Sequence, residues 1–570
     1  MAPSSCSLAF CKGKRRGFTT VAFSLLILLS ILFAACGSSS TQQSQQKGLV
    51  SLNILATPGG NFTAANFNPF IDTNIARSGT RGMIYEPLIF QNRLTGEVTG
   101  TLASSYQIAS DASSITFTLR QGIKWSDGQP FTSDDVLFTL DLLKKFPGLD
   151  LQGIWTTIIK DVAAPDANTI KVTFKSPNSV ATWFFNQTFI VPKHLWSSIA
   201  DPTRFTNDNP VGTGPFKLSK FQPEVYSLVK NPLYWQADKV KVDELRYKAA
   251  NDNTSAQVMI SSGQIDWAGI GWDPKYDIQF TKKDPEHYHH WFPPTNTVML
   301  YMNLTKAPYN DLNVRKAISL AINRDQIHAA AALYATPAHP SALLPTTKDY
   351  ISTEYQSLQF KPDIAQANQL LQQAGFTKGS DGIYAKNGKK ISFQMIVPNG
   401  WNDWVASLKV ISENLKQIGI DAQVSALATD ALWKQNLNAG NFDVAIGGTT
   451  AGPTPYFFLK DLLLSTNSWA KGKNAIGTNW EHWQDPTTDA FLTQYLGTTD
   501  PAQQKQAIQG LEKVMVEQIP AIPLDYNVGW FEYTTTKVTG WPDDHNAYDY
   551  GSPFNYPDNE YIILHLTPTK

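Results

Sequence analysis

The sequence predicts an α/β protein with more than one domain. Short stretches in which apolar residues alternate, such as Thr169–Phe174, recur between longer stretches with helical spacing of apolar residues. Strands that alternate with helices in this way are typical of layered α/β folds with parallel strands. The 570 residues, 42% of them hydrophobic, exclude a mainly disordered chain and exceed what a single hydrophobic core organises.

Residues 1–35 are interpreted as a signal peptide. Four basic residues precede the apolar run 21–35, whose fifteen residues are short for a helix that needs about 20 to cross a bilayer. A permanent membrane helix is the alternative, and it is disfavoured because polar residues follow at once. Cys36 comes after two alanines in a pattern that resembles a bacterial lipobox, so we expect a lipid on Cys36.

The segment 36–48 is expected to be a flexible tether. Beyond Cys36 it is rich in Ser, Gln and Gly and has no apolar residue, and a coil of this length reaches roughly 20 Å. Stable anchoring needs two or more acyl chains, which lipoprotein processing supplies. The sequence therefore predicts an extracytoplasmic protein that is held at the cell membrane by its lipid.

Cysteine and charge content exclude several kinds of site. The three cysteines, Cys6, Cys11 and Cys36, all lie in the signal peptide or at the lipid site, so the folded body offers no disulfide and no Cys metal site. Loss of residues 1–35 leaves 43 Lys and Arg against 48 Asp and Glu, a net charge of −5. Nucleic acid is therefore not an expected partner.

The folded body begins with a strand at Ser51–Leu55 and a loop that contains Asn61. Residues 113–144 then predict a strand, a turn and an amphipathic helix. A capping-box pattern at residues 132–135 starts that helix, so its acidic residues are interpreted as a cap. Trp125 in the turn is predicted to lie in the core.

Three further helices are predicted from helical spacing and from capping residues. One covers residues 311–333, a second begins at Asp363 and ends at Gly375, and a third begins at Asp500.

Two later units place loops at the carboxyl ends of strands. In residues 391–427 a strand, a loop with Trp401, a helix from Trp404 and a second strand follow one another. Residues 442–455 repeat the strand, the loop and the helix start, and the glycines of this second loop let a ligand approach the backbone. In open parallel sheets ligands bind where such loops emerge.

Residues 119–136 closely resemble the signature of the family 5 extracellular solute-binding proteins, the capture subunits of ABC importers. The segments 211–216, 301–324 and 519–524 are similar to other elements of that family, so the likeness spans nearly the whole mature chain. The resemblance implies a two-lobed, periplasmic-binding-protein-like fold of type II, with a ligand cleft between the lobes. It implies lobe I from residues 49–80, 214–295 and 516–570, an extra subdomain from 81–213, and lobe II from 296–515.

A membrane permease with a separate ATPase is the partner that the resemblance implies, and the protein is expected to act as a monomer. Closure of the lobes is expected to be a hinge motion biased by ligand contacts. For each tryptophan, core packing is as good an interpretation as ligand contact. The candidate ligand-binding residues are Asn61, Trp272, Trp401, Trp404, Gly448, Thr449, Tyr526 and Trp530.

The expected ligand is a neutral oligosaccharide, with an oligopeptide as the alternative. The family's peptide binders hold the peptide ammonium with an Asp at a place that corresponds to Thr449, whereas residues 447–456 contain no acidic residue. An ammonium buried without a carboxylate is unfavourable by several kcal/mol. For a peptide, Asp273 or Asp403 would have to replace the missing carboxylate.

No enzymatic activity and no cofactor are expected. The sequence lacks GxxxxGK[ST], HExxH and GxSxG motifs, and a secreted carbohydrate-active enzyme is a minor alternative. His287 and His289 fit one face of a strand as metal ligands, but no carboxylate or Cys completes a site at metal spacing. They are interpreted as part of a polar, exposed strand.

Overall fold

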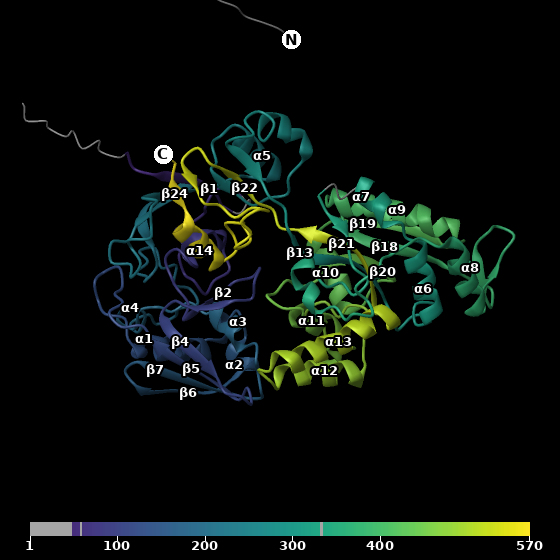
Figure 1. Cartoon of the computed structure of the whole chain (residues 1–570), viewed down its shortest axis with the longest axis horizontal. Helices are drawn as coiled ribbons and strands as arrows, with labels where there is room; N and C mark the ends of the chain where they lie inside the picture. The colour runs from purple at the N-terminus through teal and green to yellow at the C-terminus, as the bar shows by residue number, and fades with distance from the viewer. Residues whose placement is uncertain (1–47, 57–59, 331–333, 570) are drawn as a thin grey trace, which may run out of the picture. The chain divides into compact units, whose positions relative to one another are not determined.

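The computed structural model describes residues 48–56, 60–330 and 334–569. Helices and strands alternate along this part of the chain, which confirms the α/β prediction. Two large sheets and a smaller antiparallel sheet hold most of the strands (Figure 1). The expected signal peptide, Cys36 and nearly all of the tether lie outside the described residues. Among the helices that are described, none combines the length and the hydrophobicity that a membrane crossing requires.

The first large sheet has seven strands, in the order β12-β22-β11-β1-β10-β9-β8. β1 (Ser51–Leu55) is an interior strand, parallel to β10 and β11, and it confirms the strand predicted from its alternation. Leu52 and Ile54 of β1 are fully buried. The other strands are β8 (Phe216–Gln222), β9 (Val225–Lys230), β10 (Glu244–Lys248), β11 (Trp267–Ala268), β12 (Tyr288–His290) and β22 (Glu532–Thr534).

The second large sheet has six strands, in the order β14-β21-β13-β20-β18-β19. β18 pairs in parallel with both β19 and β20, which confirms the crossover units predicted at residues 391–427 and 442–455. β13 is antiparallel to both β20 and β21, so this sheet is mixed rather than parallel as the alternation predicted. The strands are β13 (Pro294–Met302), β14 (Thr336–Pro337), β18 (Ser392–Pro398), β19 (Asp421–Leu427), β20 (Val444–Gly448) and β21 (Ala521–Val528).

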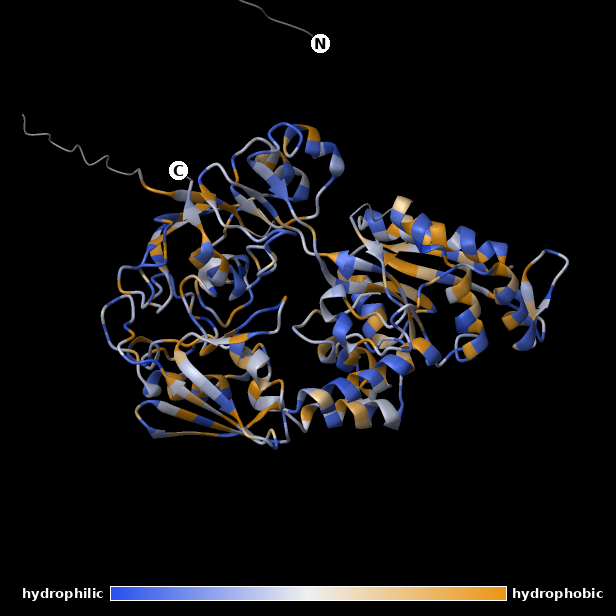
Figure 2. Cartoon of the chain, viewed as in Figure 1, coloured by the Kyte–Doolittle hydropathy of each residue, from blue (hydrophilic) through white to orange (hydrophobic). Residues whose placement is uncertain are grey.

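Three helices next to the six-stranded sheet, α6, α8 and α9, each pack an apolar face into a shared core with it. Val314 of α6, Leu371 of α8 and Leu408 of α9 share a buried cluster with Met395 of β18. Figure 2 shows these strands as largely hydrophobic, while the helices carry both hydrophobic and hydrophilic residues. The helices of this region are α6 (Leu312–Ala321), α7 (Arg324–Ala330), α8 (Ile364–Gln373), α9 (Asn402–Gln417), α10 (Asp430–Ala439), α11 (Tyr456–Leu463), α12 (Pro486–Leu496) and α13 (Pro501–Gln518).

The helix predicted at residues 311–333 is two helices in the structure, α6 and α7. Ile322 has an extended backbone between them, and the side chain of Asn323 accepts a hydrogen bond from the backbone N–H of Gln326 to begin α7. Residues 331–333 lie outside the described residues. The predicted starts of α8 and α13 are confirmed, because Asp363 and Asp500 both act as caps.

Two neighbouring segments join the two large sheets. β12 pairs with β22 in the first sheet, and β13 pairs with β21 in the second, both antiparallel. Between these pairs the N–H of Trp291 donates to the carbonyl of Phe531 at 2.9 Å, and the N–H of Gly529 donates to the carbonyl of Pro293 at 2.8 Å. Residues 288–302 and 521–534 thus form one two-stranded ribbon, which we call the connecting ribbon (Figure 1).

The smaller sheet, β4-β5-β7-β6, packs against the helix predicted within residues 113–144. That helix, α1 (Ser133–Lys145), begins with the predicted capping box, and Trp125 is fully buried. Asp135 accepts hydrogen bonds from the backbone N–H of Thr132 at 2.9 Å and of Lys193 at 2.9 Å. The strands are β4 (Ala103–Ile108), β5 (Ser114–Leu119), β6 (Ile159–Asp166) and β7 (Thr169–Phe174), next to α2 (Ile154–Thr157), α3 (Ala181–Asn186) and α4 (Lys193–Trp196).

The remaining elements are short. They are β2 (Ile89–Gln91), β3 (Val98–Gly100), β15 (Thr377–Lys378), β16 (Tyr384–Lys386), β17 (Lys389–Lys390), β23 (Val538–Thr539), β24 (Thr567–Pro568), α5 (Asn253–Ser261) and α14 (Asp558–His565). Short 3₁₀ or π segments occur at Ala76–Thr80, Pro147–Leu149, Pro274–Gln279, Pro345–Tyr350 and Ser465–Asn467.

Asp134 and Asp135 offer a matched test of the capping interpretation. Asp135→Ala leaves two backbone N–H groups without their acceptor, so we expect it to lower the free energy of unfolding by about 2–4 kcal/mol. Asp134 lies on the surface, where it pairs with Lys193, so Asp134→Ala should change stability little. Urea unfolding followed by circular dichroism measures both, and equal effects of the two substitutions would contradict the cap.

Candidate functional site

A cavity of about 610 Å³ lies where the connecting ribbon meets elements that pack on both large sheets. The start of α9 and strand β21 supply one part of its wall, and α5 with residues 271–276 supplies another. Four of the eight candidate residues line it together, namely Trp272, Trp401, Trp404 and Trp530. A cavity between elements that pack on two separate sheets is a common place for a small ligand.

Trp401 and Trp404 form an aromatic wall at the start of α9. Their rings lie edge to face with centroids 4.7 Å apart, and Trp401 is 38% exposed. Trp433 of α10 lies behind them, 5.5 Å from Trp401 and 6.1 Å from Trp404, and belongs to the core. The core therefore holds two rings whose remaining surface is free for a ligand.

Trp272 and Trp530 lie on the side of the first sheet. Trp272 is 4% exposed, and its indole N–H donates to Asp277 at 2.7 Å, so only a small part of it faces the cavity. Trp530 follows β21 in the connecting ribbon and packs against Phe292 and Tyr334, with centroids 4.8 and 6.0 Å away. These contacts fix the orientation of both indoles.

The polar groups of the cavity come from several segments. Gln257 of α5 accepts a hydrogen bond from the N–H of Asp273 at 3.0 Å, and Asp273 forms an ion pair with Lys275 at 2.6 Å. Asp525 of β21 and Asp403 of α9 also line the cavity.

The two carboxyls on the side of the second sheet have raised pKa values. Burial raises the pKa of Asp525 to about 7, with Asp403 adding to the rise and Arg324 opposing it. Asp403 is the more exposed residue of the two, yet desolvation of its carboxyl raises its pKa as well. Near neutral pH, Asp525 is therefore divided between its protonated and its ionised form.

The other four candidate residues do not line this cavity. The hydroxyl of Thr449 accepts from the N–H of Thr297 at 3.0 Å, and the hydroxyl of Tyr526 donates to the carbonyl of Leu343 at 2.6 Å. Gly448 lies next to the wall, because a Cβ there would be 4.0 Å from Trp404. Asn61 is exposed in its loop.

Several polar residues of the cavity were missed in the sequence. Asp525 and Asn527 alternate along β21, so both side chains lie on the same face, and Asn253 and Gln257 are four residues apart on α5. The signal for Asp525 was a single acidic residue inside the apolar strand Ala521–Val528. The corresponding signal on α5 was too weak, because polar residues are common on a helix surface.

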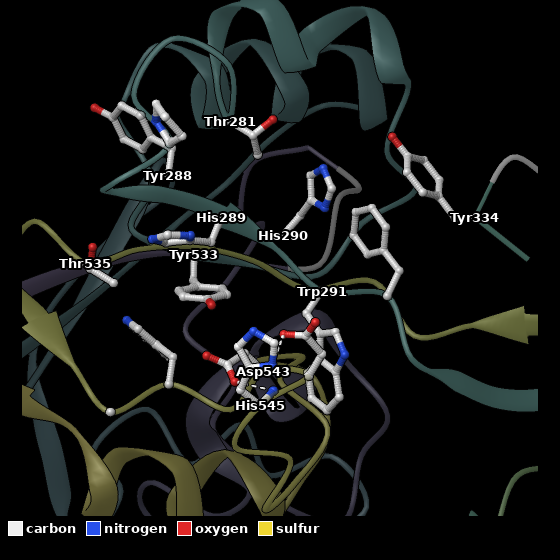
Figure 3. A pocket seen from close by; sticks show the side chains of 15 residues that line it. Thr281, Tyr288, His289, His290, Trp291, Tyr334, Tyr533, Thr535, Asp543 and His545 are labelled. Atoms are coloured by element: carbon white, nitrogen blue, oxygen red, sulfur yellow. Dashed lines mark hydrogen bonds and ion pairs between the residues drawn. The ribbon is translucent and has the colours of Figure 1, made fainter. Parts of the chain in front are cut away.

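A second cavity, of about 700 Å³, lies on the first sheet. It is lined by residues of β12, β22 and the segment 540–545, with Tyr334 shared between the two cavities. Figure 3 shows the rings of His289 and Tyr533 facing each other, and their centroids are 5.1 Å apart. His287 instead pairs with Asp284 at 3.0 Å.

The two histidines that the sequence suggested as metal ligands thus contact different residues, His289 the ring of Tyr533 and His287 the carboxyl of Asp284. β12, which carries His289, is partly buried rather than exposed as expected. Among the described residues no three His, Cys, Asp or Glu side chains are grouped as metal ligands.

The cavity of about 610 Å³ is the candidate ligand site. Its walls come from strands β13 and β21 and the start of α9 on the side of the six-stranded sheet, and from α5 and residues 271–276 on the side of the seven-stranded sheet. The second cavity is lined mainly by β12, β22 and the segment 540–545 on the side of the seven-stranded sheet. A ligand in the candidate site therefore contacts elements that pack on both sheets, and such contacts change when the sheets move relative to one another.

Comparison with known proteins identifies a family and several relatives of this chain. The model of the bacterial extracellular solute-binding proteins, family 5 (middle region), matches residues 97–470. The nickel-binding periplasmic protein of Escherichia coli K12 is 26% identical over 78% of this chain and 84% of its own length. The glutathione-binding protein of Escherichia coli O6:K15:H31 is 25% identical over 83% of this chain and 88% of its own.

A solved structure gives a similar result. The periplasmic oligopeptide-binding protein of an ABC transporter from Thermotoga maritima superposes with a TM-score of 0.82 at 26% identity, over 91% of this chain and 99% of its own. Its mannohexaose-bound structure superposes with a TM-score of 0.74, over 91% and 98%. The predicted two-lobed fold is thereby confirmed.

Trp401 and Trp433 offer a matched test of which indoles belong to the cavity wall. Trp433 is buried among Trp401, Trp404 and Trp480, so Trp433→Ala should lower the free energy of unfolding by about 3–5 kcal/mol. Trp401→Ala should lower it by about 1 kcal/mol or less, because this ring is partly exposed. Thermal unfolding measures both, and a large loss of stability with Trp401→Ala would assign that ring to the core.

Proposed function

The chain belongs to the bacterial extracellular solute-binding proteins of family 5, and we propose that it captures a neutral oligosaccharide for an ABC importer. Proteins of this family act outside the cytoplasm, where they bind a small ligand and work with permease and ATPase subunits. The observation that carries the choice of ligand is the cavity with indoles on both sides. In this proposal the protein is a monomer that docks on the permease in its closed, ligand-bound form and catalyses no reaction.

The lining of the cavity suits a sugar. Trp401 and Trp404 present ring surfaces on which the apolar faces of sugar rings stack, and Asn253, Asn527 and Gln257 supply amides for the hydroxyls at the edges. Among relatives, the Thermotoga protein is described as oligopeptide-binding, yet one of its structures contains mannohexaose. This neighbour therefore supports the proposal that a protein of this fold binds an oligosaccharide.

An oligopeptide is the second candidate, and two carboxyls favour it. Asp403 and Asp525 line the cavity and would serve as partners for a peptide ammonium. The loop after β20 offers no such partner, since residues 447–456 contain no acidic side chain and Thr449 is bonded to Thr297. Two relatives are named for nickel and glutathione, both of which carry charge, and this supports a charged ligand as the alternative.

Hydrolysis is a third and weaker candidate. Glycosidases use two carboxyls about 5–10 Å apart, and Asp403 and Asp525 line the same cavity. The family and its relatives are solute-binding proteins, which supports capture without turnover. Cleavage of oligosaccharides by the purified protein, lost in Asp525→Asn, would favour an enzyme instead.

We propose that the connecting ribbon is the hinge between the lobes. β21 lies in the six-stranded sheet. We therefore place the return of the chain from lobe II to lobe I after residue 528, whereas the boundary expected from the sequence was before residue 516. On the side away from the ribbon, the hydroxyl of Ser179 donates to the carbonyl of Tyr495 at 2.9 Å, and the N–H of Ser179 donates to the carbonyl of Leu496. These contacts join the proposed extra subdomain to lobe II and would form on closure.

Loss of either wall indole should weaken sugar binding. Trp401→Ala and Trp404→Ala each remove a stacking surface, so we expect the Kd for the best oligosaccharide to rise about thirtyfold. Calorimetry against cello-, xylo- and manno-oligosaccharides and a mixed peptide library measures this. Trp155→Ala is the matched control, because Trp155 is half-buried and lies outside the cavity.

The same titrations separate the two ligand classes. Peptide binding that survives Trp401→Ala and Trp404→Ala, together with no binding of any sugar, would show that the oligosaccharide proposal is wrong.

A lipid on Cys36 is a separate proposal, based on the sequence around residues 33–37. Cys36→Ala removes the thiol that would carry the lipid, so the variant should leave the membrane fraction or accumulate with residues 1–35 attached. Membrane fractionation and intact mass measure the two outcomes. An unchanged distribution, with a mass that differs only by the substitution itself, would mean that Cys36 carries no lipid.

A further inference from the structure

Asp525 is a buried carboxyl at the floor of the candidate ligand site. It is 6% exposed, lies in β21 opposite Val298 of β13 and Pro337 of β14, and lines the cavity. Within the described residues its side chain has no hydrogen bond and no ion pair at contact distance. Burying a polar group without a hydrogen-bond partner costs free energy. A hydrogen-bond donor on a bound ligand would remove this cost for Asp525.

The charged groups around Asp525 are few. On β13 and β14 its direct neighbours, Val298 and Pro337, carry no charge. Arg324 of α7 is the nearby cation, but its guanidinium donates to the carbonyls of Pro523 at 2.9 Å and Ser319 at 3.2 Å. Asp403 of α9 is the nearby anion.

Among the described residues, the opposite wall adds no free cation. Lys275 lines the cavity there and is paired with Asp273 at 2.6 Å. Tyr334 also lines the cavity, and burial raises the pKa of its hydroxyl, so it stays neutral. Within this part of the chain, no charged group of the cavity wall is therefore positioned to neutralise both Asp525 and Asp403.

We propose that Asp525 and Asp403 form a subsite that accepts hydrogen bonds from neighbouring hydroxyls of the ligand, and that binding there releases a proton. This inference rests on the proposed function and names the groups that select the sugar. Hydrogen bonds from hydroxyls to a carboxylate are strong and directional. The wall indoles bind the ring faces, and the two carboxyls discriminate between arrangements of the hydroxyls.

Binding releases a proton because the carboxyl of Asp525 is partly protonated in the free protein and ionised in the complex. Burial places the pKa of Asp525 at about 7 in the free protein, so near neutral pH a substantial fraction carries a proton. Ligand hydroxyls that donate to the carboxylate favour the ionised form and lower this pKa in the complex. Affinity should therefore rise with pH up to about 7, by at most about tenfold per pH unit, and level off above it.

Calorimetry of the mature protein with its best oligosaccharide tests the subsite. Titrations at pH 6.5 in two buffers with different ionisation enthalpies give the number of protons released, which should be about 0.3 to 0.8 for one group of this pKa. Asp525→Asn keeps the shape of the side chain but does not ionise. We expect it to release no proton, to bind with the same affinity from pH 5.5 to 8, and to bind more weakly at pH 8 by about tenfold or more.

Asp201→Asn is the matched control, because Asp201 is exposed and lies outside the cavity. It should retain the proton release and the pH dependence of the wild type. Folding of Asp525→Asn is checked by thermal unfolding at pH 8. Because burial raises the pKa of Asp525 above that of the unfolded chain, its contribution to stability is lost as pH rises through about 7. The variant should melt at pH 8 at the same temperature as the wild type or higher.

Three results would overturn the inference. Sugar binding without proton release, with unchanged affinity in Asp525→Asn, refutes the subsite and leaves the proposed function standing. Binding of amine-bearing peptides that depends on Asp525 would assign the carboxyls to an ammonium instead. Failure of every sugar and peptide to bind the wild type would refute the proposed function itself.

Discussion

The connecting ribbon is the constraint on which the rest of the structure depends. Residues 288–302 and 521–534 run side by side from one large sheet to the other, and their hydrogen bonds continue through the crossing. Because the ribbon pairs into both large sheets, side chains at the crossing lie near elements of both. Asp525, Asn527 and Trp530 are carried by the ribbon within six residues of chain, which explains why polar groups of the site come from a strand.

Much of the fold was predictable from local patterns. The capping box of α1, the caps Asp363 and Asp500, and the units at residues 391–427 all appear where the sequence placed them, because side-chain period and capping act within a few residues. The break between α6 and α7 was missed, although four consecutive polar residues, 323–326, interrupt the apolar spacing there and Asn323 begins the second helix. The pairing of β21 with β13 joins residues more than two hundred positions apart, which no local pattern conveys.

The site was predictable in part. Tryptophans on loops after strands led to the four indoles that line the cavity. Thr449 was chosen because it corresponds to the place of an Asp in the family's peptide binders, and Tyr526 because it precedes Trp530 in the same segment. The structure uses the hydroxyls of both residues to bind backbone groups. The local signature of Asp525, a single acidic residue inside an apolar strand, does not reveal a ligand contact, because the place of Asp525 at the cavity depends on the way the ribbon crosses between the two large sheets. Burial inside an apolar strand makes ionisation of this carboxyl unfavourable and raises its pKa. Residues that reduce stability in this way are typical of functional sites.

The most direct measurement is a pair of crystal structures of the mature protein, one free and one with a bound oligosaccharide. We expect sugar rings stacked on Trp401 and Trp404, a hydroxyl within hydrogen-bond distance of Asp525, and lobes that differ in angle about the connecting ribbon. A sugar bound only in the cavity lined by His289 and Tyr533, or bound with Asp525 untouched and the lobes unmoved, would contradict the proposed site and hinge.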